Sequence, residues 1–189
     1  GIVGKDGETH HGVFDVAFLS SLPNMTIYMP KDLYDLEAIL KFSLTFNAPL
    51  AIRYESGYYG EFDFHKEIIY GKWEPLTKLC GKNLIAYGNN MLHLAFKVRQ
   101  MLSEENIEIG IINAAFIKPL DGMLLNSLDG TAVILEESLP FGSLYSMVCS
   151  YISTNNLALK AVSVCLPDSY IGHGCNQDLL DRYDMTADK

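Results

Sequence analysis

Strands and helices alternate along the second half of the chain, and this alternation constrains the fold more than any other feature of the sequence. Apolar runs with the length of strands are separated by segments whose apolar residues recur at helical spacing. The predicted order is strand 84–87, helix 91–105, strand 107–113, helix 122–128, strand 131–135, helix 142–152, strand 158–164 and helix 176–183. This pattern is typical of an α/β domain whose mainly parallel sheet carries helices on both faces.

The first sixty residues predict a smaller α/β unit ahead of this sheet. Residues 13–19 have the pattern of a short helix and residues 25–29 that of a strand, and Asp32 can cap a helix that continues to residue 44. Another strand is expected at 50–54. Residues 55–78 contain three glycines, several charges and one strand-like run at 68–70, so they are expected to form a connection. We therefore divide the chain into residues 1–60, a connector at 61–78 and a second unit at 79–189.

The composition limits the classes of function. The chain has 189 residues, 49% of them hydrophobic, and a formal net charge of −9. This charge argues against nucleic-acid binding, because proteins of that class carry basic patches. No apolar run reaches the roughly 18 residues of a membrane span, and the four cysteines show neither metal-ligand nor CxxC spacing. We expect a cytoplasmic protein that has no metal site of its own and binds neither nucleic acid nor membrane.

Glycines, carboxylates and histidines crowd into residues 4–12, ahead of the first predicted helix. Glycine lets the backbone bend and approach a ligand closely. Asp6 supplies an acceptor, and His10 supplies a titratable donor four residues later. The stretch predicts a polar ligand pocket. The alternative is a glycine-rich turn before a helix, with solvated histidines.

Arg53 is one of only three arginines and is predicted at the carboxyl end of a strand. Ligands of open α/β sheets bind at that edge, and a guanidinium group there favours an anion. The alternatives are an ordinary surface arginine and a structural ion pair.

Other polar residues are assigned structural or solvent roles. His11 is expected to shape the loop rather than to catalyse, and His173, which stands between two glycines, is expected to hold a turn between the two units. Glu136 and Glu137 end a predicted strand and are expected to be solvated. The histidines expected at the surface are His65 and His93.

Several short motifs follow one another along nearly the whole chain. They are Asp-Gly-x-Thr-His-His at 6–11, Leu-Pro-Asn-Met at 22–25, Met-Pro at 29–30, Ile-Arg-Tyr at 52–54, Ala-Tyr-Gly at 86–88, Ile-Lys-Pro-Leu-Asp at 117–121, Glu-Glu at 136–137 and Leu-Pro-Asp-Ser-Tyr-Ile-Gly-His-Gly at 166–174. The series resembles the 1-deoxy-D-xylulose-5-phosphate synthases, which are thiamine-diphosphate enzymes of the transketolase superfamily. Asp-Gly-x-Thr-His and Lys-Pro-Leu-Asp are also similar to transketolase proper. Gly-Val-Phe-Asp at 12–15 and the motif at 166–174 favour the deoxyxylulose enzymes.

The resemblance implies that residues 1–60 are the latter half of a pyrimidine-binding domain and residues 79–189 a C-terminal transketolase domain. The implied reaction condenses pyruvate, after decarboxylation, with D-glyceraldehyde 3-phosphate to give 1-deoxy-D-xylulose 5-phosphate and CO₂. In the family, a separate N-terminal domain and residues upstream of the first motif hold thiamine diphosphate and Mg²⁺. The chain starts directly on the loop and stops after what reads as the cap and first turn of a helix at 184–189. We therefore expect a fragment of a homodimeric enzyme that cannot anchor the cofactor and is inactive alone.

The motifs also imply roles for three residues that act on the acceptor substrate. Asp6 is implied to accept a hydrogen bond from a substrate hydroxyl group. His10 is implied to be the catalytic residue, which binds the intermediate and assists proton transfer. Arg53 is implied to bind the substrate phosphate. No residue is assigned to the cofactor or to a metal.

Residues 55–57 depart from the family pattern. After Arg-Tyr the family usually continues with proline, a basic residue and glycine, whereas Glu55, Ser56 and Gly57 follow here. A carboxylate two positions after Arg53 weakens the positive field that a phosphate needs, and this leaves an altered acceptor preference open. Two further interpretations stay open. One is a transketolase-like or split-transketolase subunit, and the other is a non-catalytic dimerisation or regulatory module.

Overall fold

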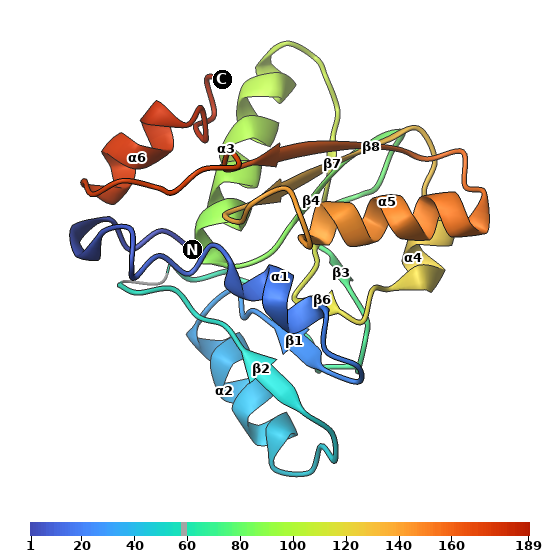
Figure 1. Ribbon diagram of the computed structural model, residues 1–189. Coiled ribbons are helices and arrows are strands. Elements are labelled where there is room, and N and C mark those ends of the chain that lie inside the picture. Colours follow the sequence, from blue (N-terminus) through green and yellow to red (C-terminus); the bar gives the residue numbers. More distant parts are fainter. Residues whose placement is uncertain (58–59) are drawn as a thin grey trace.

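A computed structural model describes residues 1–57 and 60–189. The larger of its two sheets is built from strands between residues 74 and 165 (Figure 1). Its strand order is β3-β5-β4-β7-β8. Four of the strands are parallel, and the short edge strand β3 pairs antiparallel with β5. The strands are β3 (Glu74–Pro75), β4 (Lys82–Ala86), β5 (Gly110–Asn113), β7 (Thr131–Glu136) and β8 (Lys160–Cys165). The predicted mainly parallel sheet is therefore confirmed.

Helices cover both faces of this sheet, as the alternation predicts. The helices are α3 (Asn89–Glu104), α4 (Gly122–Ser127), α5 (Leu144–Asn155) and α6 (Asn176–Arg182). In β4, Ile85 packs in the core cluster that includes α5 residues, whereas Leu84 and Ala86 pack in the cluster that includes α3 and α6 residues. Side chains on a strand point alternately to its two faces, so α3 and α6 cover one face and α5 covers the other. Within the described residues, no helix is long and apolar enough to cross a membrane.

The smaller sheet has three strands in the order β2-β1-β6. The strands β1 (Thr26–Tyr28) and β2 (Leu50–Ile52) are parallel and are joined through α2 (Leu33–Ser43). Asp32 caps α2, because its carboxylate accepts a hydrogen bond of 2.8 Å from the Asp35 amide. This confirms the cap that the sequence predicts. Ahead of β1 lie a short 3₁₀ turn, η1 (Gly4–Asp6), and the helix α1 (Asp15–Ser20).

The third strand of the smaller sheet, β6 (Phe116–Lys118), comes from the second half of the chain and was not predicted. It pairs antiparallel with β1. The indole nitrogen of Trp73 donates to the Phe116 carbonyl over 2.8 Å, which ties the connector to the same strand. Ile27 of β1 and Ile134 of β7 belong to one buried cluster. The two units therefore share a core.

Two short segments differ from the predicted elements. Residues 68–70 are not a strand, and Ile69 and Tyr70 are exposed, because the connector reaches the edge of the large sheet only at β3. Residues 184–189 form a turn, with the Lys189 amide donating to the Thr186 carbonyl over 3.3 Å, rather than the first turn of a regular helix.

The helix α1 is held firmly against the second unit. A Cβ atom on Gly142 would lie 2.8 Å from the Cα of Ala17, and Gly142 has a φ of +66°, so only glycine suits this position. The ammonium of Lys118 donates to the carbonyls of Ser20 (2.8 Å) and Leu22 (2.7 Å) at the carboxyl end of α1. These contacts fix the helix whose first residue is Asp15.

Candidate active site

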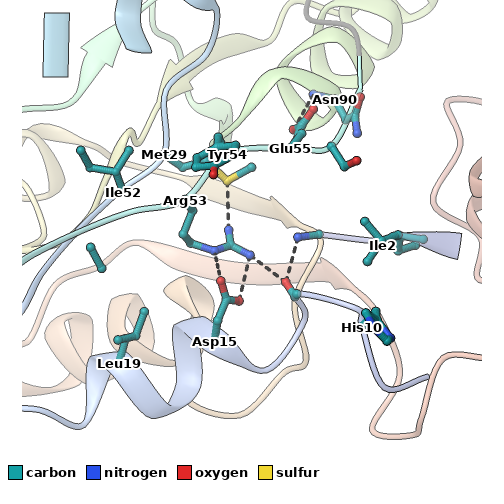
Figure 2. A pocket seen from close by; sticks show the side chains of 15 residues that line it. Ile2, His10, Asp15, Leu19, Met29, Ile52, Arg53, Tyr54, Glu55 and Asn90 are labelled. Carbon is teal, nitrogen blue, oxygen red and sulfur yellow. Dashed lines mark hydrogen bonds and ion pairs between the residues drawn. The ribbon is translucent and has the colours of Figure 1, made fainter. Parts of the chain in front are cut away.

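A cavity of about 390 Å³ lies where the glycine-rich loop, α1 and the carboxyl end of β2 meet (Figure 2). Met29 follows β1 and Arg53 follows β2, so the cavity opens at the carboxyl ends of two parallel strands. Ligands bind at this edge in α/β sheets. The residues that line it are Gly1, Ile2, Val3, His10, Gly12, Asp15, Leu19, Met29, Ala51, Ile52, Arg53, Tyr54, Glu55, Ser56 and Asn90.

Arg53 is buried in the wall of this cavity, with 7% of its surface exposed. Its guanidinium group forms a two-pronged ion pair with Asp15: Nε donates to Oδ2 over 2.6 Å and Nη2 to Oδ1 over 3.0 Å. Nη2 also donates to the Gly12 carbonyl (2.9 Å), and Nη1 to the Met29 sulfur (3.0 Å). Burial alone would lower the pKa of Arg53, but interactions with Tyr87 and Asp15 raise it. The structural ion pair that the sequence left open is therefore present, and the same guanidinium faces the cavity.

His10 lines the cavity with Arg53, but Asp6 does not. His10 is exposed on the loop side of the cavity (Figure 2). Its Nδ1 lies 2.9 Å from the Thr9 hydroxyl. Asp6 ends η1 on the exposed side of the loop and is not among the described residues that line the cavity. Of the three residues implied to act on the acceptor, the structure thus brings two to one cavity.

His11 fixes the shape of the loop, as predicted. The side chain is buried, and its Nδ1 accepts a hydrogen bond of 3.0 Å from the Val3 amide. Since Nδ1 accepts, Nε2 carries the proton and donates to the Gly172 carbonyl over 3.2 Å. Gly4 lies so close to the same segment that a Cβ atom there would be 2.2 Å from the Gly174 carbonyl oxygen. The loop is therefore clamped to residues 172–174 of the second unit.

Further contacts join the loop to the start of α6. The Gly4 amide donates to the Asn176 side-chain oxygen over 2.7 Å. The Nε2 of His173 lies 3.0 Å from the Lys5 carbonyl, which confirms that His173 acts between the two units. The surface positions predicted for His65 and His93 are also confirmed.

Glu136 and Glu137 were predicted as solvated charges, and this prediction is wrong. Both are buried at the end of β7. Glu136 accepts from the Tyr87 hydroxyl (2.9 Å) and from two amides at the start of α5, those of Leu144 (3.1 Å) and Tyr145 (3.0 Å). A carboxylate is favourable at a helix N-terminus, where backbone amides lack partners. Acidic residues between a buried strand and a predicted helix were the signal that could have revealed this role.

Two more carboxylates belong to this region, Glu55 in the cavity lining and Glu137 near Arg53. The sequence predicts that Glu55 weakens the positive field around Arg53, but it predicts no role for Glu137 in the site. Glu137 accepts from the Ile2 amide (2.9 Å) and from the side chain of Asn90 (3.3 Å). Glu55 lines the cavity and accepts from the Asn90 amide at 3.0 and 3.3 Å. Burial, followed by repulsion from Glu137, raises the pKa of Glu55 to about 7, although hydrogen bonds to backbone amides oppose the shift. The cavity lining thus includes both its arginine and an acid whose pKa is raised to about 7.

The described residues do not fit a magnesium–diphosphate group. Among residues 1–57 and 60–189, no cluster of three or more His, Cys, Asp or Glu side chains could hold a metal ion. The cavity's guanidinium is already paired with the Asp15 carboxylate, and the described residues that line the cavity provide no cluster of ligands for the metal of such a group.

Comparison with known proteins identifies both parts of the chain. Residues 1–60 match the family model "Transketolase, pyrimidine binding domain", and residues 71–189 match "Transketolase, C-terminal domain". The 1-deoxy-D-xylulose-5-phosphate synthase of Clostridium perfringens (strain SM101 / Type A) is 42% identical in an alignment 189 positions long that covers 96% of this chain and 30% of the relative. That of Clostridium tetani is 40% identical and covers 98% of this chain and 30% of the relative. The chain thus spans about a third of the length of these curated relatives.

The fold agrees with this assignment. A solved structure described as "Split gene transketolase, inactive beta4 tetramer" superposes with a TM-score of 0.87 at 28% identity, covering 96% of this chain and 60% of that one. The two family models, taken together with the mixed α/β architecture, show that this chain belongs to the transketolase family.

Proposed function

We propose that this chain forms the acceptor side of a thiamine-diphosphate-dependent transferase. The enzyme would condense pyruvate with D-glyceraldehyde 3-phosphate to 1-deoxy-D-xylulose 5-phosphate and CO₂, a step toward isoprenoid precursors. The observation that carries the proposal is one cavity that joins His10 of the loop to Arg53 at the end of β2. The similarity to synthases named for this product supports the choice of reaction.

The chemistry divides between this chain and the rest of the enzyme. Thiamine diphosphate, held with Mg²⁺ by the remaining part, supplies the carbon–carbon bond-forming chemistry. His10 would give a proton to the aldehyde oxygen of the acceptor as that bond forms. Arg53 would place its positive charge near the acceptor phosphate. Asp6 is exposed, so its proposed hydrogen bond to a substrate hydroxyl requires the ligand to reach the outer face of the loop.

The proposal includes the partners and the compartment. Residues 1–60 would complete a pyrimidine-binding domain only with the missing N-terminal portion of the enzyme, and the enzyme would act as a homodimer. The chain alone would then be inactive. All four cysteines are free, which suits a reducing cytoplasm.

Steady-state kinetics of the enzyme that contains this chain test the proposal. With pyruvate and D-glyceraldehyde 3-phosphate it should release CO₂ and form 1-deoxy-D-xylulose 5-phosphate, both measurable by mass spectrometry. Arg53→Lys keeps a positive charge but loses the planar two-pronged pairing, so the acceptor KM should rise roughly tenfold while the pyruvate KM stays within about twofold. The matched control is Arg182→Ala, a change at an exposed arginine of α6 that should alter neither constant. Equal effects on both substrates would remove Arg53 from the phosphate-binding role.

A second candidate is a subunit of a split transketolase that acts on sugar phosphates. The superposition on a split-gene transketolase with a TM-score of 0.87 favours it. A ketose phosphate offered as donor in place of pyruvate separates the two candidates, because only a transketolase should transfer a two-carbon unit from it. The isolated chain could also be a non-catalytic dimerisation or regulatory module, since the matched structure is described as an inactive tetramer. Light scattering with a thiamine diphosphate titration tests that reading: a stable oligomer without cofactor binding supports it.

A further inference from the structure

We propose that Asp15 is a positioning residue for an anion site in the cavity: it holds the Arg53 guanidinium so that Nη1 is the donor left for a tetrahedral anion. This inference rests on the proposed function, in which Arg53 binds the acceptor phosphate. It adds which atom of Arg53 meets the anion and which residue keeps that atom in place. Asp15 acts through Arg53 rather than on the substrate itself.

The ring of Tyr87 restrains the plane of the guanidinium group. The Cζ atom of Arg53 lies over this ring, 5.6 Å from its centroid. Tyr87 is buried, and its hydroxyl donates to Glu136 over 2.9 Å, so the ring itself is held in place. The attraction between a cation and a ring face depends mainly on their separation, so it leaves the guanidinium free to rotate in its own plane. A second restraint is needed to fix the direction in which each N–H bond points.

Asp15 supplies this second restraint. Its carboxylate accepts from Nε over 2.6 Å and from Nη2 over 3.0 Å, so two hydrogen bonds occupy one edge of the Arg53 guanidinium. A two-point contact of this kind fixes the rotation of the group as well as its position. Asp15 is the first residue of α1, and the contacts of Gly142 and Lys118 hold α1 against the second unit. The direction of Arg53 is therefore set by a firmly packed helix.

The remaining nitrogen of the guanidinium group, Nη1, is the donor that an anion can take. Its acceptor is the Met29 sulfur at 3.0 Å, and Figure 2 shows Met29 and Asp15 on opposite sides of the group. A thioether sulfur is a weak acceptor, whereas a phosphate oxygen is charged and accepts strongly. Met29 and Arg53 both line the cavity, so an anion bound there would replace the sulfur at Nη1.

Asp15 has two effects on such an anion, and they have opposite signs. Its charge repels the anion, while its hydrogen bonds keep Nη1 directed at the cavity. An anion at Nη1 is separated from the carboxylate by the guanidinium itself, so repulsion acts over a longer distance than attraction. Without Asp15, the buried guanidinium would turn toward the Gly12 carbonyl, which lies 2.9 Å from Nη2, and toward Glu137, whose charge also acts on Arg53. We therefore expect the loss of orientation to outweigh the loss of repulsion.

Sulfate binding to this chain tests the inference, because sulfate is a tetrahedral dianion like a phosphate ester. A titration followed by two-dimensional ¹H–¹⁵N NMR reads the Arg53 Nε–H resonance, which Arg53→Lys identifies by its loss, and the backbone amides of the cavity lining. Asp15→Asn keeps the shape of the side chain but has one oxygen and one NH₂ group, so it should bind sulfate roughly tenfold more weakly than the unchanged chain. Asp15→Glu keeps the carboxylate and should recover part of this loss. The matched control, Asp178→Asn, changes an exposed acid in the first turn of α6 and should leave sulfate binding unchanged.

Met29→Leu tests the assignment of Nη1 while the ion pair stays intact. Leucine has nearly the volume of methionine, so the fold should tolerate it, but leucine cannot accept a hydrogen bond from Nη1. Nη1 then has no contact with position 29 to give up, and sulfate should bind roughly threefold more tightly. Unchanged or weaker binding in Met29→Leu would remove Nη1 as the donor to the anion.

Kinetics of the enzyme that contains this chain give a further measurement. Asp15→Asn should raise the KM for D-glyceraldehyde 3-phosphate roughly tenfold, while the pyruvate KM stays within about twofold. A variant that is only destabilised would not separate the two constants. Equal or tighter sulfate binding in Asp15→Asn would mean that Asp15 only neutralises Arg53, and would overturn the inference. So would an equal loss in Asp178→Asn, or an unchanged chain that binds no sulfate.

The two proposals can fail separately. A parent enzyme that makes no 1-deoxy-D-xylulose 5-phosphate would refute the proposed function, while weaker sulfate binding in Asp15→Asn would still show that Asp15 positions Arg53 for an anion. A parent that forms this product, with an unchanged acceptor KM in Asp15→Asn, would keep the reaction and remove Asp15 from the positioning role.

Discussion

Replacing Glu136 by glutamine should destabilise the fold far more than the same change at an exposed glutamate. The carboxylate of Glu136 is fully buried and accepts three hydrogen bonds, from Tyr87, Leu144 and Tyr145. An amide has one oxygen and one NH₂ group, so one of the donors must face an NH₂ group and lose its partner.

The expected magnitude follows from these contacts. A buried donor left without a partner costs about 1–3 kcal/mol. The negative charge at the N-terminus of α5 contributes about 1 kcal/mol more. We therefore expect Glu136→Gln to lower the free energy of unfolding by about 3 kcal/mol. In a domain of this size that corresponds to a decrease in Tm of roughly 6–12 °C.

Urea unfolding provides the assay. Trp73 is the only tryptophan and is buried, so its fluorescence reports the core, and far-UV circular dichroism reports the helices. Agreement of the two probes supports a two-state analysis. Glu105→Gln, at an exposed position after α3, serves as the matched control and should change the free energy by less than about 0.5 kcal/mol. A loss below about 1 kcal/mol in Glu136→Gln would refute the reasoning that its carboxylate holds the start of α5.

Three further substitutions test the loop, the cavity acid and a helix cap. Gly4→Ala should cost at least about 2 kcal/mol in urea unfolding, because its Cβ would lie 2.2 Å from the Gly174 carbonyl oxygen, whereas Gly81→Ala meets nothing within 4 Å and should be nearly neutral. The pKa of Glu55 in the folded protein is about 7, which lies above its ordinary value of 4.5. Between these two pH values the folded protein therefore keeps a proton on Glu55 that the unfolded chain has lost. This group therefore adds stability as the pH falls through 7, and Glu55→Gln should reduce that gain, measured as Tm against pH. Asp32→Ala should cost about 1 kcal/mol by removing the cap of α2, seen as a loss of unfolding free energy.

Each of these three predictions would be contradicted by a specific measured result. An alanine at position 4 that matches the control at 81 would mean that the loop does not need its close approach to residue 174. Identical dependence of Tm on pH in the two proteins would mean that Glu55 does not titrate near neutrality. An unchanged free energy of unfolding in Asp32→Ala would mean that the Asp32 side chain stabilises the start of α2 no more than hydrating water does.

The sequence was informative wherever structure depends on local pattern. Strand and helix alternation, with apolar residues at the right spacing, predicts β4, α3, β7 and α5 because each element buries a face of its own. The cap at Asp32 is local as well, since its side chain bonds to an amide three residues later. The family motifs in turn indicate the transketolase fold.

Contacts between distant segments were not visible in the sequence. The strand β6 has only three residues and is a strand because β1 lies beside it, so no local pattern marks it. Glu136 looks like a surface charge until the start of α5 is placed against it. The partner of Arg53 was open for the same reason: Asp15 is 38 residues away in the sequence and is brought close by the packing of α1.

The strand β6 has a consequence for the mechanics of the chain. Because it contributes a strand of the second half to the sheet of the first, a cut in the connector would not separate the halves. Residues 1–57 would stay bound to the remainder through backbone hydrogen bonds between β1 and β6 and through the shared core. The two pieces should therefore behave as complementing fragments, which reassemble when mixed and unfold in one transition.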